Sequence, residues 1–293
     1  MSDDIEYIRS KTILSKLKNG PDPYFGITYN INLYRGCQHQ CIYCDSRSEV
    51  YQLGDLSSIK LKENSLDLLD LALYKRPAKG TIGTGSMNDP YMAIEQEMGF
   101  TSKALEIINK YRYPVHIITK SDLVVRDTDL IKDISKVYSA VSLTITTVDD
   151  SQSTKIEPRA PVSSKRFEAL SKLRQNGIYA GVLVMPILPY INNTEENIIQ
   201  LVEKSYANGA AYVLFAPGVT LRDVQRDYYY SKLDDFFPGV RSLYEKTFGN
   251  RYNCTSPNEK ILSETFYNTC AKRHIPTSMI FFKENNPIQS TLF

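Results

Sequence analysis

Three cysteines lie close together in the first part of the chain, at Cys37, Cys41 and Cys44. Their spacing is C-x3-C-x2-C, and the aromatic residue Tyr43 directly precedes the last of them. Thiolates bind iron–sulfur clusters, which usually take four cysteine ligands. With only three thiolates nearby, a four-iron cubane keeps one iron open, and an open metal position is where a metal site performs chemistry. The motif therefore predicts a [4Fe–4S] cluster with a free coordination site.

Other uses of these cysteines fit the sequence less well. A zinc site needs a fourth ligand at matching spacing, and His39 stands too close to the neighbouring cysteines to complete a tetrahedron comfortably. The remaining cysteines, Cys254 and Cys270, lie far along the chain and form no C-x2-C pair. Five cysteines is an odd number and no secretory signal precedes them, which disfavours a disulfide framework. Zinc remains the alternative metal.

The composition is that of an ordinary globular protein. The chain has 293 residues, 42% hydrophobic and 23% charged, enough for one large domain or one domain with an appended piece. Its net charge of +2 does not by itself call for nucleic acid. No apolar run approaches the roughly 18 residues of a membrane span. Free cysteines without an export signal lead us to expect a cytoplasmic protein.

Short apolar segments alternate with amphipathic ones, which indicates a parallel α/β fold. Six segments rich in apolar, largely β-branched residues are typical of buried parallel strands; they span residues 26–33, 79–83, 115–118, 141–145, 178–185 and 211–215. Helices are expected at 65–74, 101–112 and 163–175, and after the capping residue Thr194. Six such units make a partial barrel, and an open doubly wound sheet is the alternative.

The domain organisation follows from a change of pattern after the sixth strand. Residues 26–216 carry the alternating units, and residues 1–25 form an N-terminal segment before them. Residues 217–293 are rich in aromatic side chains and are expected to be a C-terminal helical extension. Within it, Arg222, Arg226 and the tyrosines at 228–230 either stack on single-stranded nucleic acid or pack a helix onto the barrel.

Polar side chains follow several of the predicted strands. Residues 83–90 follow the second strand, Lys120 ends the third, and Ser142 and Thr144 share one face of the fourth. In a parallel barrel the active site forms at the C-terminal ends of the strands. The cysteine loop follows the first strand, so it is expected at the same edge as these polar groups.

The cysteine motif resembles the signature of the radical S-adenosylmethionine (radical SAM) superfamily. Further segments resemble its spore photoproduct lyase-like branch, often labelled "DNA repair photolyase", over about residues 20 to 275. The segments are 32–37, 88–91 with Glu95, 118–121, Arg126-Asp127, 142–147 and Glu157-Pro158. The resemblance implies a partial (β/α)6 TIM-type barrel. It also implies a cluster on the three cysteines that reductively cleaves SAM to a 5′-deoxyadenosyl radical for hydrogen abstraction.

The same resemblance implies a set of SAM contacts. Asn88 and Asp89 match positions near the amino and carboxylate groups of SAM, Lys120 matches a residue that pairs with the carboxylate, and Ser142 matches one near the ribose. Arg159 is a weaker candidate, which could equally form a surface salt bridge. A zwitterionic cofactor needs an acid for its amine and a cation for its carboxylate. Outside such a motif, the same residue types serve turns, backbone or solvent.

One position departs from the family. Spore photoproduct lyase returns a hydrogen atom to its product through a cysteine thiol, and Ser86 occupies the matching stretch here. An O–H bond is too strong to donate hydrogen as a thiol does. Cys254 or Cys270 can substitute only if the fold brings one near the site, and both are otherwise small buried apolar residues.

The partners that these observations imply are an electron donor of the flavodoxin or ferredoxin type and DNA. The last five residues, Gln289 to Phe293, resemble the short peptide that docks on the bacterial DNA sliding clamp. We therefore expect a radical SAM enzyme acting on DNA or a modified nucleotide. The alternatives are a radical SAM enzyme for a small molecule, peptide or RNA, and a non-catalytic, clamp-associated metal-binding module.

Overall fold

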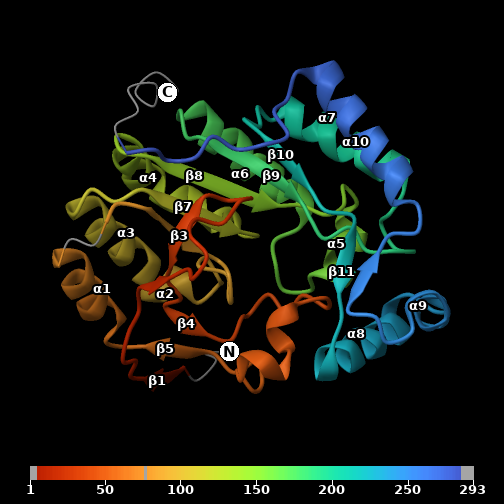
Figure 1. The fold of residues 1–293 in the computed structure, drawn as a ribbon, viewed down its shortest axis with the longest axis horizontal. Helices are drawn as coiled ribbons and strands as arrows, with labels where there is room; N and C mark the ends of the chain where they lie inside the picture. The colour runs from red at the N-terminus through yellow and green to blue at the C-terminus, as the bar shows by residue number, and fades with distance from the viewer. Residues whose placement is uncertain (1–4, 76–77, 285–293) are drawn as a thin grey trace.

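A computed structural model describes residues 5–75 and 78–284 of the chain. Its centre is a seven-stranded sheet in the order β10-β9-β8-β7-β6-β3-β2, in which only the edge strand β2 runs antiparallel (Figure 1). The strands are β2 (Ser15–Lys16), β3 (Ile27–Asn30), β6 (Thr81–Thr84), β7 (Val115–Thr119), β8 (Ser139–Thr144), β9 (Ala180–Val184) and β10 (Val213–Phe215). All six predicted parallel strands are present in this sheet.

The strand order decides between the two predicted architectures. From β3 to β10 each parallel strand pairs with the next one along the chain. A doubly wound sheet would reverse direction at a switch point, whereas a barrel winds one way throughout. The sheet is therefore the partial (β/α)6 barrel, with β2 extending its first edge.

Helices fill the connections and cover one face of the sheet. The helices α4, α6 and α7 pack on β8 and β9, while α1, α3 and α4 pack side by side on the earlier strands. Their bounds are α1 (Ser65–Tyr74), α2 (Glu95–Met98), α3 (Phe100–Lys110), α4 (Thr128–Ser135), α5 (Asp150–Ile156), α6 (Ser163–Gln175) and α7 (Glu195–Ala207). The predicted helices 65–74 and 163–175 have these bounds, and α6 ends before Gly177, whose φ of +78° favours glycine.

A second, small sheet lies beside the first edge of the barrel. It consists of β1 (Glu6–Ile8), β5 (Lys60–Lys62) and β4 (Tyr34–Arg35), with β5 in the middle. Because Tyr34 and Arg35 pair with β5, the first barrel strand ends at Asn30 instead of continuing to Leu33. The chain between β4 and β5 carries the cysteines and two short 3₁₀ turns, η1 (Asp45–Arg47) and η2 (Glu49–Tyr51). A third turn, η3 (Asp122–Asp127), follows β7.

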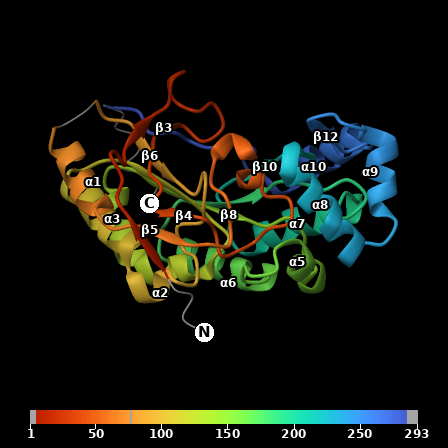
Figure 2. The ribbon, with the colours of Figure 1, turned by 90° about the horizontal axis from the view of Figure 1, so that it is seen from below.

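The C-terminal extension contains the expected helices and one feature that was not predicted. The helices are α8 (Asp223–Phe236), α9 (Val240–Phe248) and α10 (Glu259–Arg273). The addition is an antiparallel pair, β11 (Gly218–Thr220) with β12 (Asn253–Thr255), which joins the two ends of the α8–α9 unit. Figure 2 shows α8, α9 and β12 at one end of the molecule, far from α1 and α3.

The aromatic and basic side chains of α8 pack within the protein. Tyr229 is fully buried and Tyr230 nearly so, and both lie against Tyr244 of α9. The guanidinium of Arg226 donates to backbone carbonyls of Leu221 and Arg251 at 2.8 and 2.7 Å. These contacts match the packing interpretation of this segment. Gln289 to Phe293, the proposed clamp peptide, lie outside the described residues.

After α10 the chain returns across the barrel. Pro276 accepts a hydrogen bond from Val213 at the start of β10, and Tyr138, just before β8, donates to the Ile280 carbonyl at 2.8 Å. Phe281 then reaches Gly26, where a Cβ atom would lie 2.7 Å from its ring. The segment 276–284 therefore closes the N-terminal end of the strands, opposite the cysteine loop (Figure 1). No helix among the described residues is long and apolar enough to cross a membrane.

Candidate active site

The cysteine loop is held by its backbone on both sides. Cys37 donates its N–H to the Leu56 carbonyl at 2.8 Å, and Ile42 donates to the carbonyl of Ile156 at the end of α5 at 2.9 Å. Gly36 begins the loop with a φ of +85°, and a Cβ atom there would lie 2.4 Å from the Ser58 carbonyl oxygen. Only glycine fits this position, so the residue before the first cysteine is set by backbone geometry.

The three cysteines border one cavity of about 990 Å³ at the C-terminal ends of the barrel strands. None forms a disulfide; Cys37 and Cys41 are buried, and Cys44 is partly exposed. Burial raises the pKa of the Cys37 thiol to about 12, and the charges of Asp89 and Cys44 contribute to this rise. Burial likewise raises the pKa of Cys41, and Cys37 and Cys44 contribute. The three thiols are thus close enough to influence one another.

The arrangement fits a cluster better than a single ion. In the described part of the chain, no three His, Cys, Asp or Glu side chains converge as ligands of one metal ion. A cubane takes one thiolate per iron, so its cysteines stand farther apart than the ligands of one ion. Three free thiols on one loop at the wall of a cavity have the chemistry and the placement that such a cluster requires.

Asp89 lies in the same wall, and its carboxylate is already engaged. It accepts hydrogen bonds from the Thr119 hydroxyl and the Lys120 N–H, both at 2.6 Å, and from the Tyr91 N–H at 2.9 Å. His39 Nε2, from the cysteine loop, is 3.2 Å from its second oxygen. Burial alone raises the pKa of Asp89, but His39 and these donors hold it well below its usual range. Asp89 therefore ties the cysteine loop to the end of β7.

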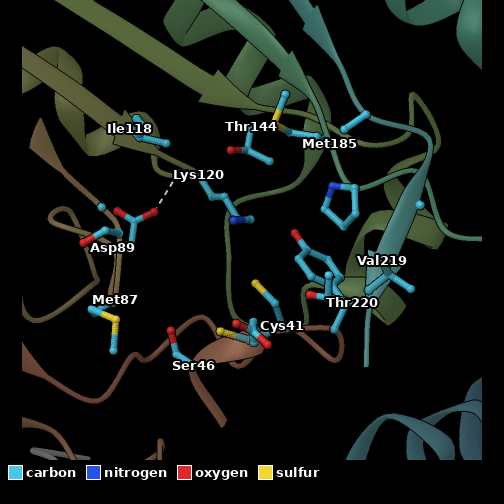
Figure 3. Close-up of a pocket in the computed structure, with 18 of the residues that line it drawn as sticks. Cys41, Ser46, Met87, Asp89, Ile118, Lys120, Thr144, Met185, Val219 and Thr220 are labelled. Atoms are coloured by element: carbon cyan, nitrogen blue, oxygen red, sulfur yellow. Dashed lines mark hydrogen bonds between the residues drawn. The ribbon is translucent and has the colours of Figure 1, made fainter. Parts of the chain in front are cut away.

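Lys120 projects into the middle of the cavity. Figure 3 shows its side chain between Asp89 and Cys41, while Thr144 and Met185 form the wall behind it. Its ammonium lies 5.7 Å from the centre of the Tyr43 ring. Burial lowers the pKa of Lys120, but the negative charges of Cys41, Glu157 and Asp89 outweigh this and raise it. The cavity thus holds a permanent cation close to the cysteines.

Asn88 borders the cavity next to Lys120 and Asp89, whereas two other predicted contacts do not. The side-chain amide of Asn88 donates to the Tyr34 carbonyl at 2.6 Å, and within residues 5–75 and 78–284 its side-chain oxygen accepts no hydrogen bond. Ser142 is fully buried below the cavity floor and is not among the residues that border it. Arg159 is exposed on the outside, where its backbone N–H donates to His39. The structure brings Asn88, Asp89 and Lys120 to the cysteines, but not Ser142 or Arg159.

Ser142 belongs to a buried chain of polar groups inside the barrel. Its hydroxyl lies 2.8 Å from His116 Nε2 and 2.7 Å from the Tyr212 hydroxyl. His116 Nδ1 lies 3.2 Å from the Phe25 carbonyl, so both ring nitrogens have partners. Burial lowers the pKa of His116 to about 4, and the imidazole is therefore neutral at pH 7. The chain joins β7, β8 and the start of β10.

This histidine predicts an acid-sensitive fold. The pKa of His116 is about 4 in the folded protein and 6.5 in the unfolded chain. Between pH 6.5 and pH 4 the imidazole is therefore protonated in the unfolded chain but neutral in the folded protein. We expect the free energy of unfolding to fall by roughly 3 kcal/mol from pH 6.5 to pH 4 through this group. Urea titrations of wild type and His116→Gln at several pH values measure it. An equally steep decline in the variant would contradict the assignment.

Of the two cysteines outside the motif, only Cys254 lies at the cavity. Cys254 borders it through strand β12, but its side chain packs among Tyr229 and Tyr244, with its sulfur 3.7 Å from the Arg251 carbonyl. Cys270 lies in the core beneath α10. Ser86, by contrast, is at the cavity wall, so the position matching the family's cysteine presents a hydroxyl. Among the described residues, the cysteines that border this space are the three of the motif and Cys254.

One group near the cysteines was not assigned a role from the sequence. Glu157, just after α5, accepts the hydroxyl hydrogen bond of Tyr43 and forms an ion pair with Arg166. Arg166 is fully buried and also donates to the Thr144 and Pro161 carbonyls at 2.9 and 2.7 Å. A charged pair so deep in a barrel is unusual. The sequence signal was the Glu157-Pro158 pair, but nothing in the pattern linked it to Arg166.

The family is defined by comparison with known proteins. The model of the radical SAM superfamily matches residues 31–202, which include the three cysteines and the strands from β6 to β9. The chain belongs to this superfamily. It is therefore a radical SAM enzyme, whose cofactors are a [4Fe–4S] cluster and SAM.

Individual relatives agree with this. An uncharacterised protein of Methanocaldococcus jannaschii is 37% identical over 67% of this chain and 73% of its own. A radical SAM Nα-GlyT isomerase of Pseudomonas phage M6 is 26% identical over 61% of this chain and 36% of its own. The structure of spore photoproduct lyase with a dinucleoside spore photoproduct covers 91% of this chain and 78% of its own, with 18% identity and a TM-score of 0.68. The chain has the fold of that lyase.

Proposed function

We propose that Cys37, Cys41 and Cys44 hold the [4Fe–4S] cluster and that the adjoining cavity binds SAM and the substrate. When bound and reduced, the cluster supplies the electron that cleaves SAM to a 5′-deoxyadenosyl radical, which abstracts hydrogen from the substrate. The observation that carries the proposal is the convergence of the three free thiols, Asn88 and Lys120 on one cavity of about 990 Å³. A cavity of this size is at the upper end of small-molecule sites.

The residues around the cavity have distinct tasks in this proposal. The Lys120 ammonium binds the carboxylate of SAM, because it is the one lysine, with no arginine, among the described residues that border the cavity. The free side-chain oxygen of Asn88 accepts from the SAM amino group. Asp89 does not contact SAM in this proposal, because its carboxylate already accepts hydrogen bonds from Thr119, Lys120 and Tyr91. Its role is to position the residues of the cavity wall. An electron donor of the flavodoxin or ferredoxin type completes the system.

The proposed substrate is DNA or a modified nucleotide. The support is the fold shared with spore photoproduct lyase, together with aromatic and sulfur side chains that suit a flat base. Tyr24, Phe25, Met87 and Met185 border the cavity. In this proposal the strand pair β11 and β12 forms one side of the substrate site, since residues 216–220 and 253–255 also border it.

The charges at the cavity favour a second candidate, a small uncharged or cationic substrate. Among the described residues that border it, the acids Asp45, Asp89 and Glu259 accompany one lysine, Lys120, and no arginine. Proteins that bind nucleic acid neutralise phosphates with Lys and Arg. In this second candidate the enzyme modifies a small molecule or a peptide. RNA is disfavoured for the same reason as DNA, because its phosphates would also need cationic side chains.

Anaerobic reconstitution with iron and sulfide tests the proposal. We expect a brown protein that forms 5′-deoxyadenosine from SAM under dithionite. Gel-shift measurements with damaged and undamaged oligonucleotides then separate the two substrates: a shift supports DNA, and SAM cleavage without any shift supports the small-substrate candidate. Zinc in place of iron in the anaerobic protein would overturn both and leave the non-catalytic module.

Lys120 provides a more local prediction. Replacing Lys120 by methionine keeps the length of the side chain but removes the charge that pairs with the SAM carboxylate. A charge-assisted hydrogen bond contributes about 1.5–3 kcal/mol, so we expect SAM affinity to fall by roughly 10- to 100-fold while iron content stays unchanged. Equilibrium dialysis of SAM with the reconstituted protein measures this. Lys155→Met, on the exposed side of α5, serves as the control and should bind SAM like the wild type.

A further inference from the structure

The chain contains two buried Tyr–Glu–Arg groups of the same design. In the first, the Tyr34 hydroxyl donates to Glu95, and Arg126 lies 3.3 Å from the other oxygen of that carboxylate. In the second, the Tyr43 hydroxyl donates to Glu157, which pairs with Arg166. Glu95 and Glu157 are both almost completely buried. The two groups differ in their arginines, because Arg126 is partly exposed and also pairs with Asp127, whereas Arg166 is fully buried. Burial raises the pKa of Glu95, while Arg166 and Lys120 hold that of Glu157 below its usual range.

Only the second group is built onto the cysteine loop. Tyr43 lies between Cys41 and Cys44. The residues before and after Glu157 also form backbone hydrogen bonds with that loop. Ile156 accepts from Ile42 at 2.9 Å, and Arg159 donates to His39 at 3.2 Å. The side chain and the backbone therefore fasten the same loop at three points. The first group holds Tyr34 of β4. Neither glutamate borders the cavity, but Tyr43 of the second group does and Tyr34 of the first does not.

The two glutamates also act electrostatically on different residues. Lys120 and Glu157 act on the Cys41 thiol in opposite directions, because the ammonium lowers its pKa and the carboxylate raises it, whereas Glu95 acts on Tyr34 and Tyr91. Burial alone raises the pKa of Glu157, but Arg166 and Lys120 hold it below its usual range, so the carboxylate is ionised at neutral pH. A fixed negative charge near an iron–sulfur cluster opposes the addition of an electron.

We propose that Glu157 and Arg166 are positioning residues of the cluster, which hold the cysteine loop through Tyr43, and that the carboxylate of Glu157 lowers the reduction potential of the cluster. Arg166 has a supporting task, because it keeps Glu157 ionised and fixes it to the Thr144 and Pro161 carbonyls. A partner of this kind sets the orientation and the electronic properties of the ligands without touching the metal. The inference rests on the proposed function, in which the three cysteines hold the cluster.

The two groups provide matched variants for the test. Glu157→Gln removes the charge near Cys41, and Glu95→Gln makes the same change away from it. In an anaerobic redox titration followed by electron paramagnetic resonance, we expect the midpoint potential of Glu157→Gln to be more positive than that of the wild type. The potential of Glu95→Gln should equal that of the wild type. Equal potentials in all three proteins, or equal shifts in both variants, would overturn the electrostatic part.

A second pair of variants tests the attachment of the loop without altering a charge. Tyr43→Phe should release iron to a chelator about tenfold faster than the wild type, and its Cys41 thiol should react faster with iodoacetamide in the metal-free protein. Tyr34→Phe should match the wild type in both measurements. Identical behaviour of the two phenylalanine variants would overturn the attachment. Wild-type protein that takes up no iron would instead overturn the proposed function, and the alkylation rates would still report on the loop.

Discussion

Replacing Cys41 by alanine is expected to remove the iron–sulfur cluster and, with it, the cleavage of SAM. Cys41 is the middle ligand of the motif, is buried, and lies beside the two other thiols in the cavity wall. Even a group that only supports a metal ligand typically costs about 10- to 100-fold in metal affinity when it is removed. Loss of a ligand itself should therefore lower the iron content to less than about a tenth of the wild-type value. Formation of 5′-deoxyadenosine should become undetectable. Iron analysis and chromatography of the anaerobic reaction measure the two effects.

The control for this variant is Cys254→Ala. Cys254 is also buried and borders the same cavity through its strand, but its thiol faces the tyrosines of α8 and α9. We expect it to keep its iron and its SAM cleavage and to lose about 1 kcal/mol of stability. Cys41→Ala protein that retains iron at the wild-type level would show that the motif cysteines do not hold the cluster. A loss of iron in both variants would point to a general defect in folding.

The convergence of the site was predictable because it follows from topology. The cysteines, Asn88, Asp89 and Lys120 come after different strands, and parallel strands place their C-terminal ends at one edge. The position of Ser142 was more difficult to predict. Alternation shows which face of the strand a residue lies on, but not how far that residue lies from the C-terminal end of the strand. Ser142 shares a face with Thr144, yet two residues of strand correspond to about 6.6 Å. Thr144 therefore borders the cavity, while Ser142 lies in the layer below.

The features that the sequence did not reveal depend on contacts between distant segments. Strands β11 and β12 have three residues each, too short for a recognisable alternation, and each is ordered by the other across the α8–α9 unit. Glu157 and Arg166 belong to a helix connection and a helix, and a charged residue in such places usually faces solvent. The packing of α6 against α5 brings Arg166 to Glu157.

Breaking the buried ion pair between Glu157 and Arg166 is expected to cause a large loss of stability. Arg166→Met keeps most of the side-chain volume but leaves the Glu157 carboxylate without its cation, in a place where both residues are almost completely buried. Removing one partner of a buried ion pair typically costs about 3–5 kcal/mol. Urea denaturation of the metal-free protein at pH 7 should show a loss of this size. Arg241→Met, which breaks exposed pairs with Asp234 and Glu245, should cost less than about 1 kcal/mol.

The pH dependence of the same variant distinguishes a lost charge from a lost volume. In the wild type, Arg166 and Lys120 hold the pKa of Glu157 below its ordinary 4.5, so this carboxylate contributes stability above that pH and loses it as the pH falls through the folded pKa. Without Arg166, burial raises the pKa of Glu157, and the folded variant takes up a proton at a higher pH than the wild type does. The stability difference between variant and wild type should therefore narrow as the pH falls from 7 towards 4.5. If the stability difference stays constant over this range, Arg166 stabilises the barrel through packing. Glu157 would then carry no buried charge that could act on the cysteine loop.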